Sequence, residues 1–264
     1  GFNAQVLEMT DDERQQLKDQ VGGSAYVGEE ELQNYELGWK QQLFNNRMSF
    51  DLAAYYMKWK NQQTTVQAML YNPSHPNADP VTGLRPIQLT VGAGKTDLWG
   101  IELTADALVG DYTKVGMTFN WAPSEYKEFY CGFVERFTGS TDCAGNSSTR
   151  FPEYSGSVFT SYTRPISDQW TGFARGEVIY FGKSFIDESN LAWTDSYTTT
   201  QLRLGAETET LRVEVWAKNL FDSYFYTGGS RQSSYAYGFD FSQQGATVTP
   251  DVGRQIGLTA IYKF

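Results

Sequence analysis

Apolar and polar residues alternate along much of the chain, and the alternation is clearest in the segment 253–264. In an extended strand successive side chains point to opposite faces, so residues two apart share a face. The apolar face of this segment comprises Ile256, Leu258, Ala260, Tyr262 and Phe264. Such an apolar face must be shielded from water. No residue follows Phe264 in this sequence, so we expect a lipid bilayer rather than further chain to cover this face.

The same alternation predicts nine strands, separated by segments rich in polar and turn-forming residues. The predicted strands span residues 35–44, 48–69, 87–109, 112–126, 154–164, 170–183, 197–207, 211–222 and 253–264. Residues 1–8 are typical of the end of a further strand. In the polar segment that follows, Thr10 and Glu13 have the spacing of a capping box, which predicts a short helix that ends near Gly22 and Gly23.

The connections between these strands alternate strictly between short turns and long loops. The turns fall at residues 45–47, 110–111, 165–168 and 208–210, and the loops at 72–86, 127–152, 184–196 and 223–250. In an antiparallel sheet all turns then lie at one end, as in outer-membrane barrels with short periplasmic turns and long extracellular loops. A soluble sheet with one face in water would show the same alternation of faces, so the asymmetry of the loops favours the membrane barrel.

The pair of strands around residues 200–218 shows how the two faces divide. One face is apolar and comprises Leu202, Leu204, Ala206, Leu211, Val213, Val215 and Ala217. The other is polar and comprises Gln201, Arg203, Glu207, Arg212, Glu214 and Lys218. Opposite charges can pair across strands on the polar face, which suits a water-filled or plugged lumen.

These patterns together predict an all-β fold, a transmembrane antiparallel up-and-down β-barrel. Nine is an odd number of strands, whereas bacterial single-chain barrels have even numbers, and an open sheet edge in lipid is not tolerated. We therefore expect residues 1–264 to form the carboxy-terminal portion of a larger barrel, with its first strands outside this chain.

Composition and charge narrow the class further. Aromatic residues make up 16% of the 264 residues and charged residues 20%, a mixture expected of strands with one apolar face and aromatic girdles. The formal net charge of −10 argues against a nucleic-acid partner, because phosphate binding needs a basic surface. The sequence contains no run of about 18 apolar residues, so it predicts no transmembrane helix. The start at Gly1 does not resemble a signal peptide, so we expect a mature product or a piece of a longer one.

The two cysteines, Cys131 and Cys143, lie in one short polar segment. Their proximity predicts a local disulfide and an oxidising compartment, and the loop-entropy model gives it a stabilising effect of about 3 kcal/mol. Two free thiols in a reducing cytosol are the alternative. A metal site fits less well, because four ligands are wanted and the only histidine, His75, is far away in sequence. We expect neither a metal nor a cofactor.

Short motifs recur in order along the chain: Gly1-Phe2-Asn3, Tyr35-Glu36-Leu37-Gly38-Trp39-Lys40, Ala53-Ala54-Tyr55-Tyr56, Ala93-Gly94-Lys95, Gly100-Ile101-Glu102-Leu103, Lys218-Asn219-Leu220-Phe221-Asp222-Ser223-Tyr224, Gly253-Arg254-Gln255-Ile256-Gly257-Leu258 and Tyr262-Lys263-Phe264. Together they span essentially the whole chain. In this order they resemble the TonB-dependent outer-membrane receptors, specifically the carboxy-terminal part of the β-barrel.

The resemblance implies a barrel of roughly 22 strands with a plugged lumen, and a plug domain and TonB box that lie outside these residues. It implies energy-coupled import of a scarce nutrient, first of all a ferric siderophore or other iron complex, across the outer membrane of a Gram-negative bacterium. Cobalamin, haem or an oligosaccharide are alternative ligands, and a passive porin or an adhesin is an alternative class. The implied partners are the TonB complex, outer-membrane lipid and lipopolysaccharide, the nutrient ligand and the barrel assembly machinery.

Residue roles follow from the motifs and the loops. Tyr262 and Phe264 resemble the signal that the assembly machinery recognises. Asn219 and Asp222 are expected to hydrogen-bond the backbone where a strand meets its loop. Ligand-stacking candidates in the loops are Tyr71, Trp193, Tyr226, Tyr235 and Tyr237, and candidates for contact with an anionic group are His75 and Arg231. Each aromatic can equally be a girdle residue.

An enzyme built on the barrel is the remaining class. Its catalysis would require a histidine oriented beside a nucleophile or a water. His75 is the sole histidine and stands in a loop without a partner motif. We therefore predict no catalytic residues and a protein that is not an enzyme.

Overall fold

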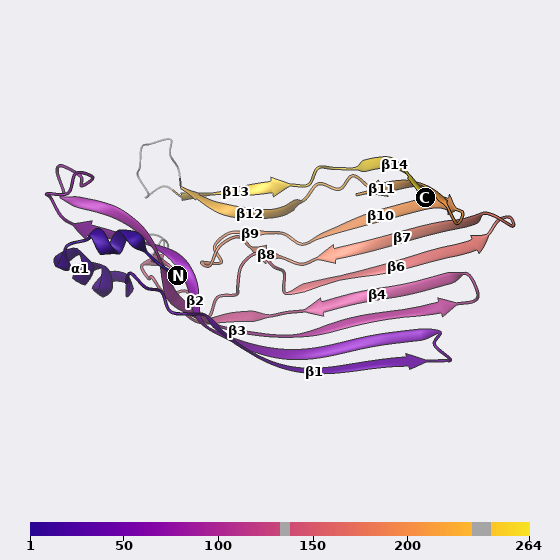
Figure 1. Ribbon diagram of the computed structural model, residues 1–264, viewed down its shortest axis with the longest axis horizontal. Coiled ribbons are helices and arrows are strands. Elements are labelled where there is room, and N and C mark those ends of the chain that lie inside the picture. Colours follow the sequence, from indigo (N-terminus) through magenta and orange to yellow (C-terminus); the bar gives the residue numbers. More distant parts are fainter. Residues whose placement is uncertain (133–137, 234–243) are drawn as a thin grey trace. The chain divides into compact units, whose positions relative to one another are not determined.

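The computed structural model describes residues 1–132, 138–233 and 244–264 (Figure 1). The chain folds as two compact units. Unit 1 comprises Gly1–Asn34, Met57–Leu98 and Ser124–Ser148, and unit 2 comprises Tyr35–Tyr56, Trp99–Pro123 and Thr149–Phe264. Three strands, at residues 31–43, 48–71 and 84–109, contribute residues to both units.

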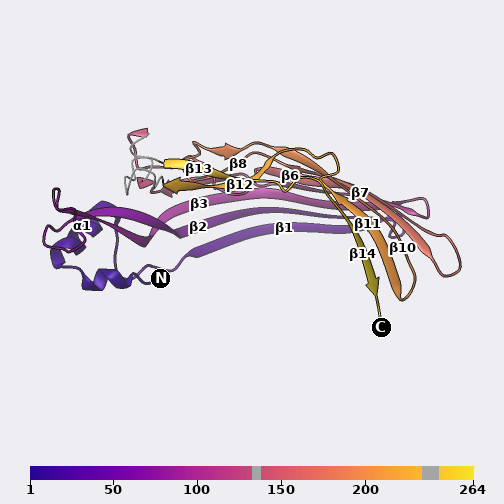
Figure 2. The same ribbon diagram turned by 90° about the horizontal axis from the view of Figure 1, so that it is seen from above.

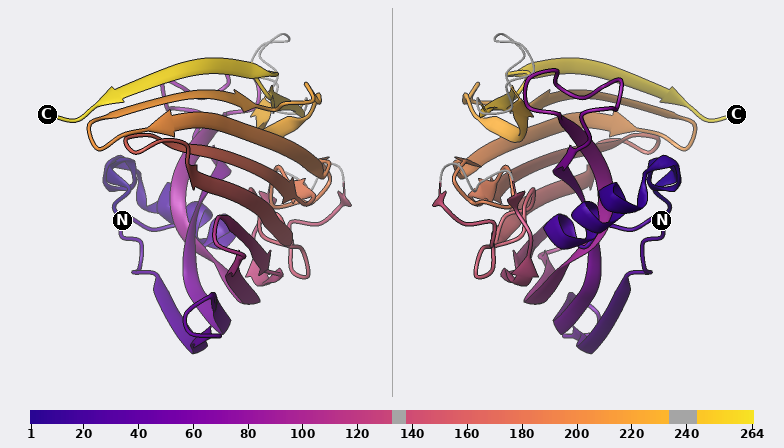
Figure 3. Two further views of the ribbon diagram at one scale, coloured as in Figure 1. Left: turned by 90° about the vertical axis from the view of Figure 1, so that its right-hand side faces the viewer. Right: turned by 90° about the vertical axis from the view of Figure 1, so that its left-hand side faces the viewer.

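Within the described residues, nine strands follow one another across one sheet, as the alternation of the sequence predicts. Their order is β1 (Glu31–Leu43), β2 (Met48–Tyr71), β3 (Leu84–Val109), β4 (Thr113–Trp121), β6 (Tyr154–Pro165), β7 (Thr171–Phe181), β10 (Tyr197–Glu207), β11 (Leu211–Lys218) and β14 (Gln255–Tyr262). The last strand, β14, lies at an edge beside β11 (Figure 3). Their antiparallel pairing runs from Leu211↔Tyr262 to Lys218↔Gln255, as the predicted up-and-down order of strands requires.

The predicted strand 112–126 is divided in two, because Pro123 has no N–H to donate to a ladder. The residues before it form β4, which pairs with β6. The residues after it form β5 (Ser124–Phe129), which continues the antiparallel pairing with β3 that β4 begins. Among the described residues, the ladder with β6 therefore ends at Trp121, whereas the pairing with β3 goes on beyond Pro123.

Two of the predicted loops contain strands of their own. The loop 184–196 holds β8 (Ser184–Phe185) and β9 (Trp193–Thr194), which pair with each other. The loop 223–250 holds β12 (Tyr226–Ser233) and β13 (Gln244–Pro250), which also form an antiparallel pair. The described parts of these segments therefore include antiparallel strand pairs.

The expectation that residues 1–8 end a strand is wrong. Ala4–Glu8 form a 3-10 helix, η1. The Asn3 side chain anchors this segment instead of a strand ladder: its Nδ2 donates to the carbonyls of Ser24 and Thr90, both at 2.8 Å, and its Oδ1 accepts from the Thr90 N–H at 3.0 Å. A side-chain amide with one acceptor and two donors can therefore replace the ladder that we expected.

The predicted helix is confirmed as α1 (Asp11–Val21). Its capping box is complete, because Thr10 Oγ1 accepts from the Glu13 N–H at 3.2 Å and Glu13 Oε2 accepts from the Thr10 N–H at 3.0 Å. The helix ends at Gly22, whose φ of 65° is the left-handed conformation that glycine favours. Among the described helices, none has both the length and the apolar character of a membrane crossing.

Unit 1 has an apolar core of its own between α1, η1 and the β2–β3 hairpin (Figure 2). Alternate residues of both strands share the face that α1 covers. The buried residues are Val6, Met9, Leu17, Val66, Ala68, Leu70, Ile87, Leu89 and Val91. Leu17 and Leu70 are fully buried, so a helix with few apolar residues is held mainly by this one contact face.

Two glutamines of α1 protect the edge of β2. Gln16 pairs with the backbone of Tyr71, donating to its carbonyl at 3.0 Å and accepting from its N–H at 2.8 Å. One helical turn later, Gln20 makes the same pair of bonds to Met69, at 2.9 and 3.2 Å. The two amides replace a neighbouring strand, and they satisfy backbone groups that would otherwise be open to association with other chains.

Unit 2 shows the division into faces that the sequence predicts. In the β10–β11 pair, Leu204 lies opposite Val215 on the apolar face, whereas Glu207 lies opposite Arg212 on the polar face. The apolar side chains are exposed: Ile256 and Leu258 on β14 keep 68% and 71% of their surface. An apolar face exposed over successive strands is what a lipid-facing sheet requires.

Candidate ligand-binding surfaces

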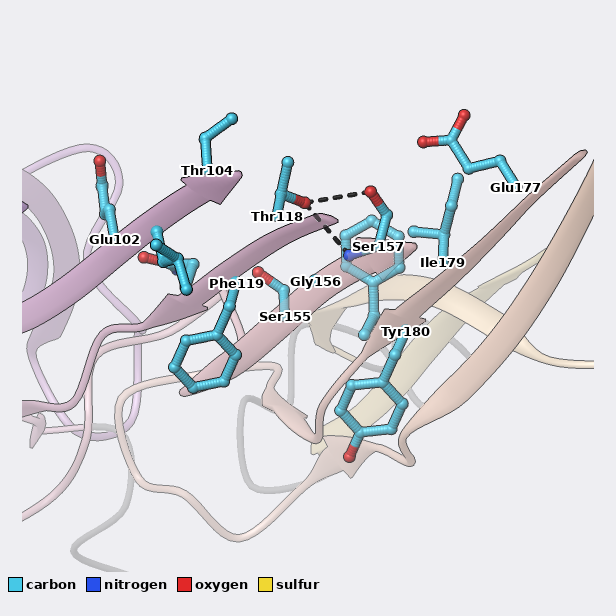
Figure 4. Close-up of a pocket in the computed structure, with 13 residues that line it drawn as sticks. Glu102, Thr104, Thr118, Phe119, Ser155, Gly156, Ser157, Glu177, Ile179 and Tyr180 are labelled. Carbon is cyan, nitrogen blue, oxygen red and sulfur yellow. Dashed lines mark hydrogen bonds between the residues drawn. The ribbon is translucent and has the colours of Figure 1, made fainter. Parts of the chain in front are cut away.

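The polar face of unit 2 has a shallow depression of about 320 Å³ across β3, β4, β6 and β7. Its polar side chains point to one side of the sheet, while Phe119 and Tyr180 point to the other (Figure 4). The labelled polar residues on that side are Glu102, Thr104, Thr118, Ser157 and Glu177.

Hydrogen-bonding capacity remains in this depression. The hydroxyls of Thr118 and Ser157 are 3.0 Å apart, and the Ser157 N–H donates to Thr118 Oγ1 at 3.1 Å. Asn120 Oδ1, which is buried, has no hydrogen-bond partner among the described residues. The depression can therefore accept hydrogen bonds from a group placed against this wall.

Elsewhere on the polar face, arginine guanidinium groups lie over phenylalanine rings. The Arg175 guanidinium is 3.8 Å from the centre of the Phe159 ring, and that of Arg212 is 4.2 Å from the centre of Phe173. Each arginine also pairs with a carboxylate on its own strand, at 3.2 Å from Arg175 to Glu177 and at 2.7 Å from Arg212 to Glu214. Opposite charges also pair across β10 and β11, at 3.2 Å from Arg212 to Glu207 and at 3.7 Å from Arg203 to Glu214, which confirms the predicted pairing across strands.

Glycines allow these rings to lie against the neighbouring strand. A Cβ at Gly116 would come within 2.5 Å of the Phe159 ring, and a Cβ at Gly205 within 2.5 Å of the Phe173 ring. No side chain fits at either position without moving the ring. The close approach of ring and backbone fixes both phenylalanines and, through them, the stacked arginines.

A second surface is formed by the hairpins β8–β9 and β12–β13. Lys183 Nζ lies 4.5 Å from the centre of the Phe185 ring and 4.1 Å from that of Trp193, which is paired with Phe185 across the β8–β9 ladder. Trp193 Nε1 donates to Asp195 at 3.1 Å, and the ring remains half exposed. No carboxylate among the described residues pairs with Lys183.

The hairpin β12–β13 packs closely on this cluster. A Cβ at Gly229 of β12 would come within 2.8 Å of the Ile186 side chain, so glycine permits the contact. Arg231, on the same strand, has its pKa lowered by burial, an effect that the carboxylates of Glu188 and Asp187 oppose. The two hairpins thus bring Trp193 and Arg231 into one region of unit 2.

The other predicted ligand residues have different surroundings. Tyr226 begins β12, and its hydroxyl accepts from that of Tyr224 at 3.3 Å. Tyr71 and His75 belong to unit 1, where the Tyr71 ring lies against Gly83 and His75 Nδ1 accepts from the Asn77 N–H at 3.1 Å. Tyr235 and Tyr237 lie outside the described residues.

Sequence reasoning missed Lys183 and Phe185. The signal was present in Phe181-Gly182-Lys183-Ser184-Phe185, where a lysine stands between aromatics at the end of a predicted strand. Lys183 ends the predicted strand 170–183 and Phe185 lies in the predicted loop 184–196, so the pattern does not place the Trp193 ring beside them.

The roles expected for Asn219 and Asp222 are confirmed. Asn219 is buried, its Oδ1 accepts from the Ser223 N–H at 2.9 Å, and its Nδ2 donates to the Ser223 carbonyl at 2.9 Å and to Asp251 Oδ2 at 2.8 Å. Asp222 Oδ1 accepts from the Arg254 N–H at 2.8 Å. These bonds tie the end of β11 to the start of β14 at the base of the β12–β13 hairpin.

In unit 1 the two cysteines are joined, with Cα atoms 5.9 Å apart. The Cys131 N–H donates to the Thr141 carbonyl at 2.7 Å, and the Cys143 N–H donates to the Phe129 carbonyl at 2.9 Å. Both sulfurs pack with Tyr126 and Phe129 in a small buried cluster. Among the residues that the structure describes, no group of acidic, histidine or cysteine side chains is arranged to hold a metal ion.

An antiparallel sheet with short turns, an exposed apolar face and a polar face of paired charges defines a transmembrane β-barrel protein. The barrel is not closed within this chain. A family model described as the TonB-dependent receptor-like β-barrel matches residues 1–220, and the chain belongs to that family. The members of this family are receptors of the Gram-negative outer membrane, which supports a role other than catalysis.

Solved structures with the same fold include several siderophore receptors. The ferric yersiniabactin uptake receptor FyuA from Yersinia pestis is 21% identical, with a TM-score of 0.65 over 89% of this chain and 30% of that chain. The siderophore receptor PiuA from Acinetobacter baumannii is 19% identical, with a TM-score of 0.59 over 90% of this chain and 29% of that one. The ferripyoverdine receptor of Pseudomonas aeruginosa is 18% identical, with a TM-score of 0.55 over 92% and 29%. The chain therefore spans about three tenths of the length of these proteins.

Proposed function

We propose that this chain is the carboxy-terminal barrel portion of an outer-membrane receptor that imports a ferric siderophore with energy supplied through TonB. The family match over residues 1–220 carries the proposal. The polar wall of unit 2 supports it, because a lumen that holds a plug and passes a polar solute needs paired charges and hydrogen-bonding groups. The plug domain, the TonB box and the first barrel strands lie outside these residues in this proposal.

The ligand surface that we propose is the cluster of Lys183, Phe185 and Trp193 together with Arg231. A lysine held between two rings, with no carboxylate among the described residues to neutralise it, favours an anionic group on the ligand. The half-exposed Trp193 ring favours an aromatic group. An anionic ferric complex with aromatic donor groups has both properties. Tyr71, His75 and Tyr226 remain candidate ligand residues.

Growth of a strain that lacks the receptor gene tests the transport function. On a panel of iron and vitamin sources, we expect a growth defect on one ferric siderophore. The intact gene should restore growth on that source, and this restored growth should be lost when TonB is absent. A defect on cobalamin, haem or an oligosaccharide would change the ligand class. Open-channel conductance of the purified protein in a planar bilayer, without TonB, would instead indicate a passive porin.

Replacing Trp193 with alanine is expected to weaken binding of the siderophore so identified by roughly tenfold. The lost ring contact and the exposed Lys183 together account for about 1.4 kcal/mol. Titration of the purified receptor with the ferric complex measures the affinity. Lys263→Gln, a charge change at the turn end of β14, is the matched control and should bind as the unmodified receptor does. Equal affinities for all three proteins would remove Trp193 from the ligand surface.

We also propose that Tyr262 and Phe264 form the signal that the assembly machinery reads. The two rings meet edge to face with their centres 5.2 Å apart, and both side chains are exposed. Tyr262 lies in the last β11–β14 pair, and Phe264 lies beyond it. Deletion of Phe264 is expected to lower the amount of folded receptor in the outer membrane, while each folded receptor binds its ligand with unchanged affinity. Heat-modifiable mobility in gels counts the folded fraction. A folded fraction equal to that of the unmodified receptor would contradict the proposal.

A further inference from the structure

Two tyrosines and an arginine gather where β4 and β6 meet at the short-turn end of unit 2. The rings of Tyr112 and Tyr162 have their centres 6.1 Å apart and meet at 65°. The Arg164 guanidinium lies over the Tyr112 ring, 5.5 Å from its centre, and also interacts with the Tyr162 hydroxyl. The Thr163 N–H donates to the Tyr112 carbonyl at 2.8 Å, which fixes the turn residue beside β6.

Arg164 differs from the arginines of the polar face in its charge balance. Arg175 and Arg212 also lie on aromatic rings, but each has a carboxylate within 3.2 Å. For Arg164, the partners among the described residues are the two tyrosines, and none is a carboxylate. A phenol supplies a hydroxyl and a ring face but no full charge, so the guanidinium keeps its charge and most of its five donors for another group.

The position of Arg164 identifies which group that is. Val158, Tyr162 and Arg164 are separated by even numbers of residues on β6 and share the apolar face, where Val158 is 60% exposed and Tyr162 is 42% exposed. In barrels of this class the short turns are periplasmic, so the turn end of the apolar face meets the headgroups of the inner leaflet. The headgroups there carry phosphodiesters, and the arginine fork and two phenol hydroxyls are suitable donors to their oxygens.

We propose that Tyr112, Tyr162 and Arg164 form a binding site for the phosphodiester of an anionic glycerophospholipid in the inner leaflet. The guanidinium donates to the phosphate oxygens, and the Tyr112 ring packs against one side of the guanidinium. The hydroxyls of Tyr112 and Tyr162 donate to the same phosphate. The acyl chains then lie along the exposed apolar face of β6. This site depends on the membrane fold and not on the ligand that the receptor transports.

Native mass spectrometry of the complete receptor tests the site. The protein is purified in detergent, stripped of lipid and titrated with phosphatidylglycerol, with phosphatidylethanolamine and with inorganic phosphate. We expect phosphatidylglycerol to bind and Arg164→Gln to weaken that binding by roughly fivefold, the effect of one cation near a lipid surface. Phosphatidylethanolamine should bind more weakly, because its ammonium group repels the guanidinium. Binding of inorganic phosphate as tightly as the lipid would show an anion site that is not a lipid site, and would overturn the proposal.

Two further variants keep the test decisive. Lys114→Gln is the control: it removes one cation from the adjacent strand β4, on the polar face, where Lys114 pairs with Asp106 at 3.0 Å. This variant should bind phosphatidylglycerol as the unmodified receptor does. The double variant Tyr112→Phe with Tyr162→Phe keeps both rings and removes both hydroxyls, so it preserves packing if Arg164→Gln fails to fold. We expect a twofold to fivefold loss for this double variant, roughly the value of its exposed hydrogen bonds. Equal losses for Lys114→Gln and Arg164→Gln, or no loss in the double variant, would overturn the site.

Discussion

Replacing Arg85 with methionine is expected to lower the free energy that holds α1 on the β2–β3 hairpin by about 3 kcal/mol. Glu13 is 2% exposed, and its carboxylate receives two bonds from Arg85, from Nη2 at 2.7 Å and from Nε at 2.8 Å. Methionine fills the space of the arginine stem but leaves a buried charge without its cation. The effect lies at the lower end of the range for buried pairs because the Arg85 side chain keeps 14% of its surface.

The loss should depend on pH in a defined direction. Burial raises the pKa of Glu13, but hydrogen bonds from the Thr10 backbone and from Arg85 outweigh it and bring the pKa from 4.5 down to about 2. A lowered folded-state pKa contributes stability that is fully present above about pH 4.5 and is lost as the pH falls toward about 2. The difference between Arg85→Met and the unmodified protein should therefore be largest near neutral pH and should narrow in acid.

Hydrogen exchange of the α1 amides in the complete receptor measures this local stability. A loss of about 3 kcal/mol corresponds to roughly a hundredfold faster exchange at neutral pH. Lys95→Met is the matched control on the same strand, because its pair with Glu128 is exposed on both sides and should contribute less than about 1 kcal/mol.

A second variant separates charge from packing. Adding Glu13→Gln to Arg85→Met removes the buried charge and keeps most of the capping box, so protection should return toward that of the unmodified protein. If the double variant exchanges as fast as the single one, the lost contact is packing and the ion-pair explanation is wrong.

Local patterns were sufficient to predict most of the elements. The capping box at Thr10 and Glu13 gave the start of α1, because both partners lie within one turn. The alternation of residues 200–218 gave both faces of β10 and β11, because a strand repeats every two residues whatever surrounds it. The loop asymmetry predicted the membrane class, which the family match over residues 1–220 supports.

The errors arose where one side chain or one missing donor outweighs the pattern. Asn3 anchors residues 1–8 through bonds to Ser24 and Thr90, and the second of these lies 87 positions away. Pro123 divides a run that alternates on both sides of it, and β5 after it keeps β3 as its partner while the ladder with β6 ends at Trp121. Neither long-range choice is encoded in the periodicity of the segment itself.

The candidate ligand surface was predictable only in part for the same reason. Trp193 and Arg231 were chosen as loop residues with suitable chemistry, but their neighbours come from other segments. Lys183 meets Trp193 through the β8–β9 pairing, and Gly229 brings β12 onto Ile186. Contacts between loops depend on tertiary packing that a single sequence does not display.

Replacing both Cys131 and Cys143 with alanine is expected to lower the local stability of β5 and its loop by about 3 kcal/mol. The cross-link closes a loop between residues 12 apart and lies in a cluster with Tyr126 and Phe129. The cost of losing it is chiefly the entropy that the open segment regains.

The single variants decide whether the cross-link or the packing is responsible. Replacing either cysteine removes the disulfide. Cys131→Ala and Cys143→Ala should therefore each increase the exchange rate of the β5 amides by roughly a hundredfold. The double variant should exchange little faster than either single variant. Losses that add across the two single variants would point to side-chain packing in the Tyr126 and Phe129 cluster instead.

Alkylation of both thiols in the unmodified protein without reductant would show that the bond does not form in solution. Because unit 1 has a small core of its own, a bond that fixes β5 against β3 should contribute more there than it would in the continuous sheet of unit 2.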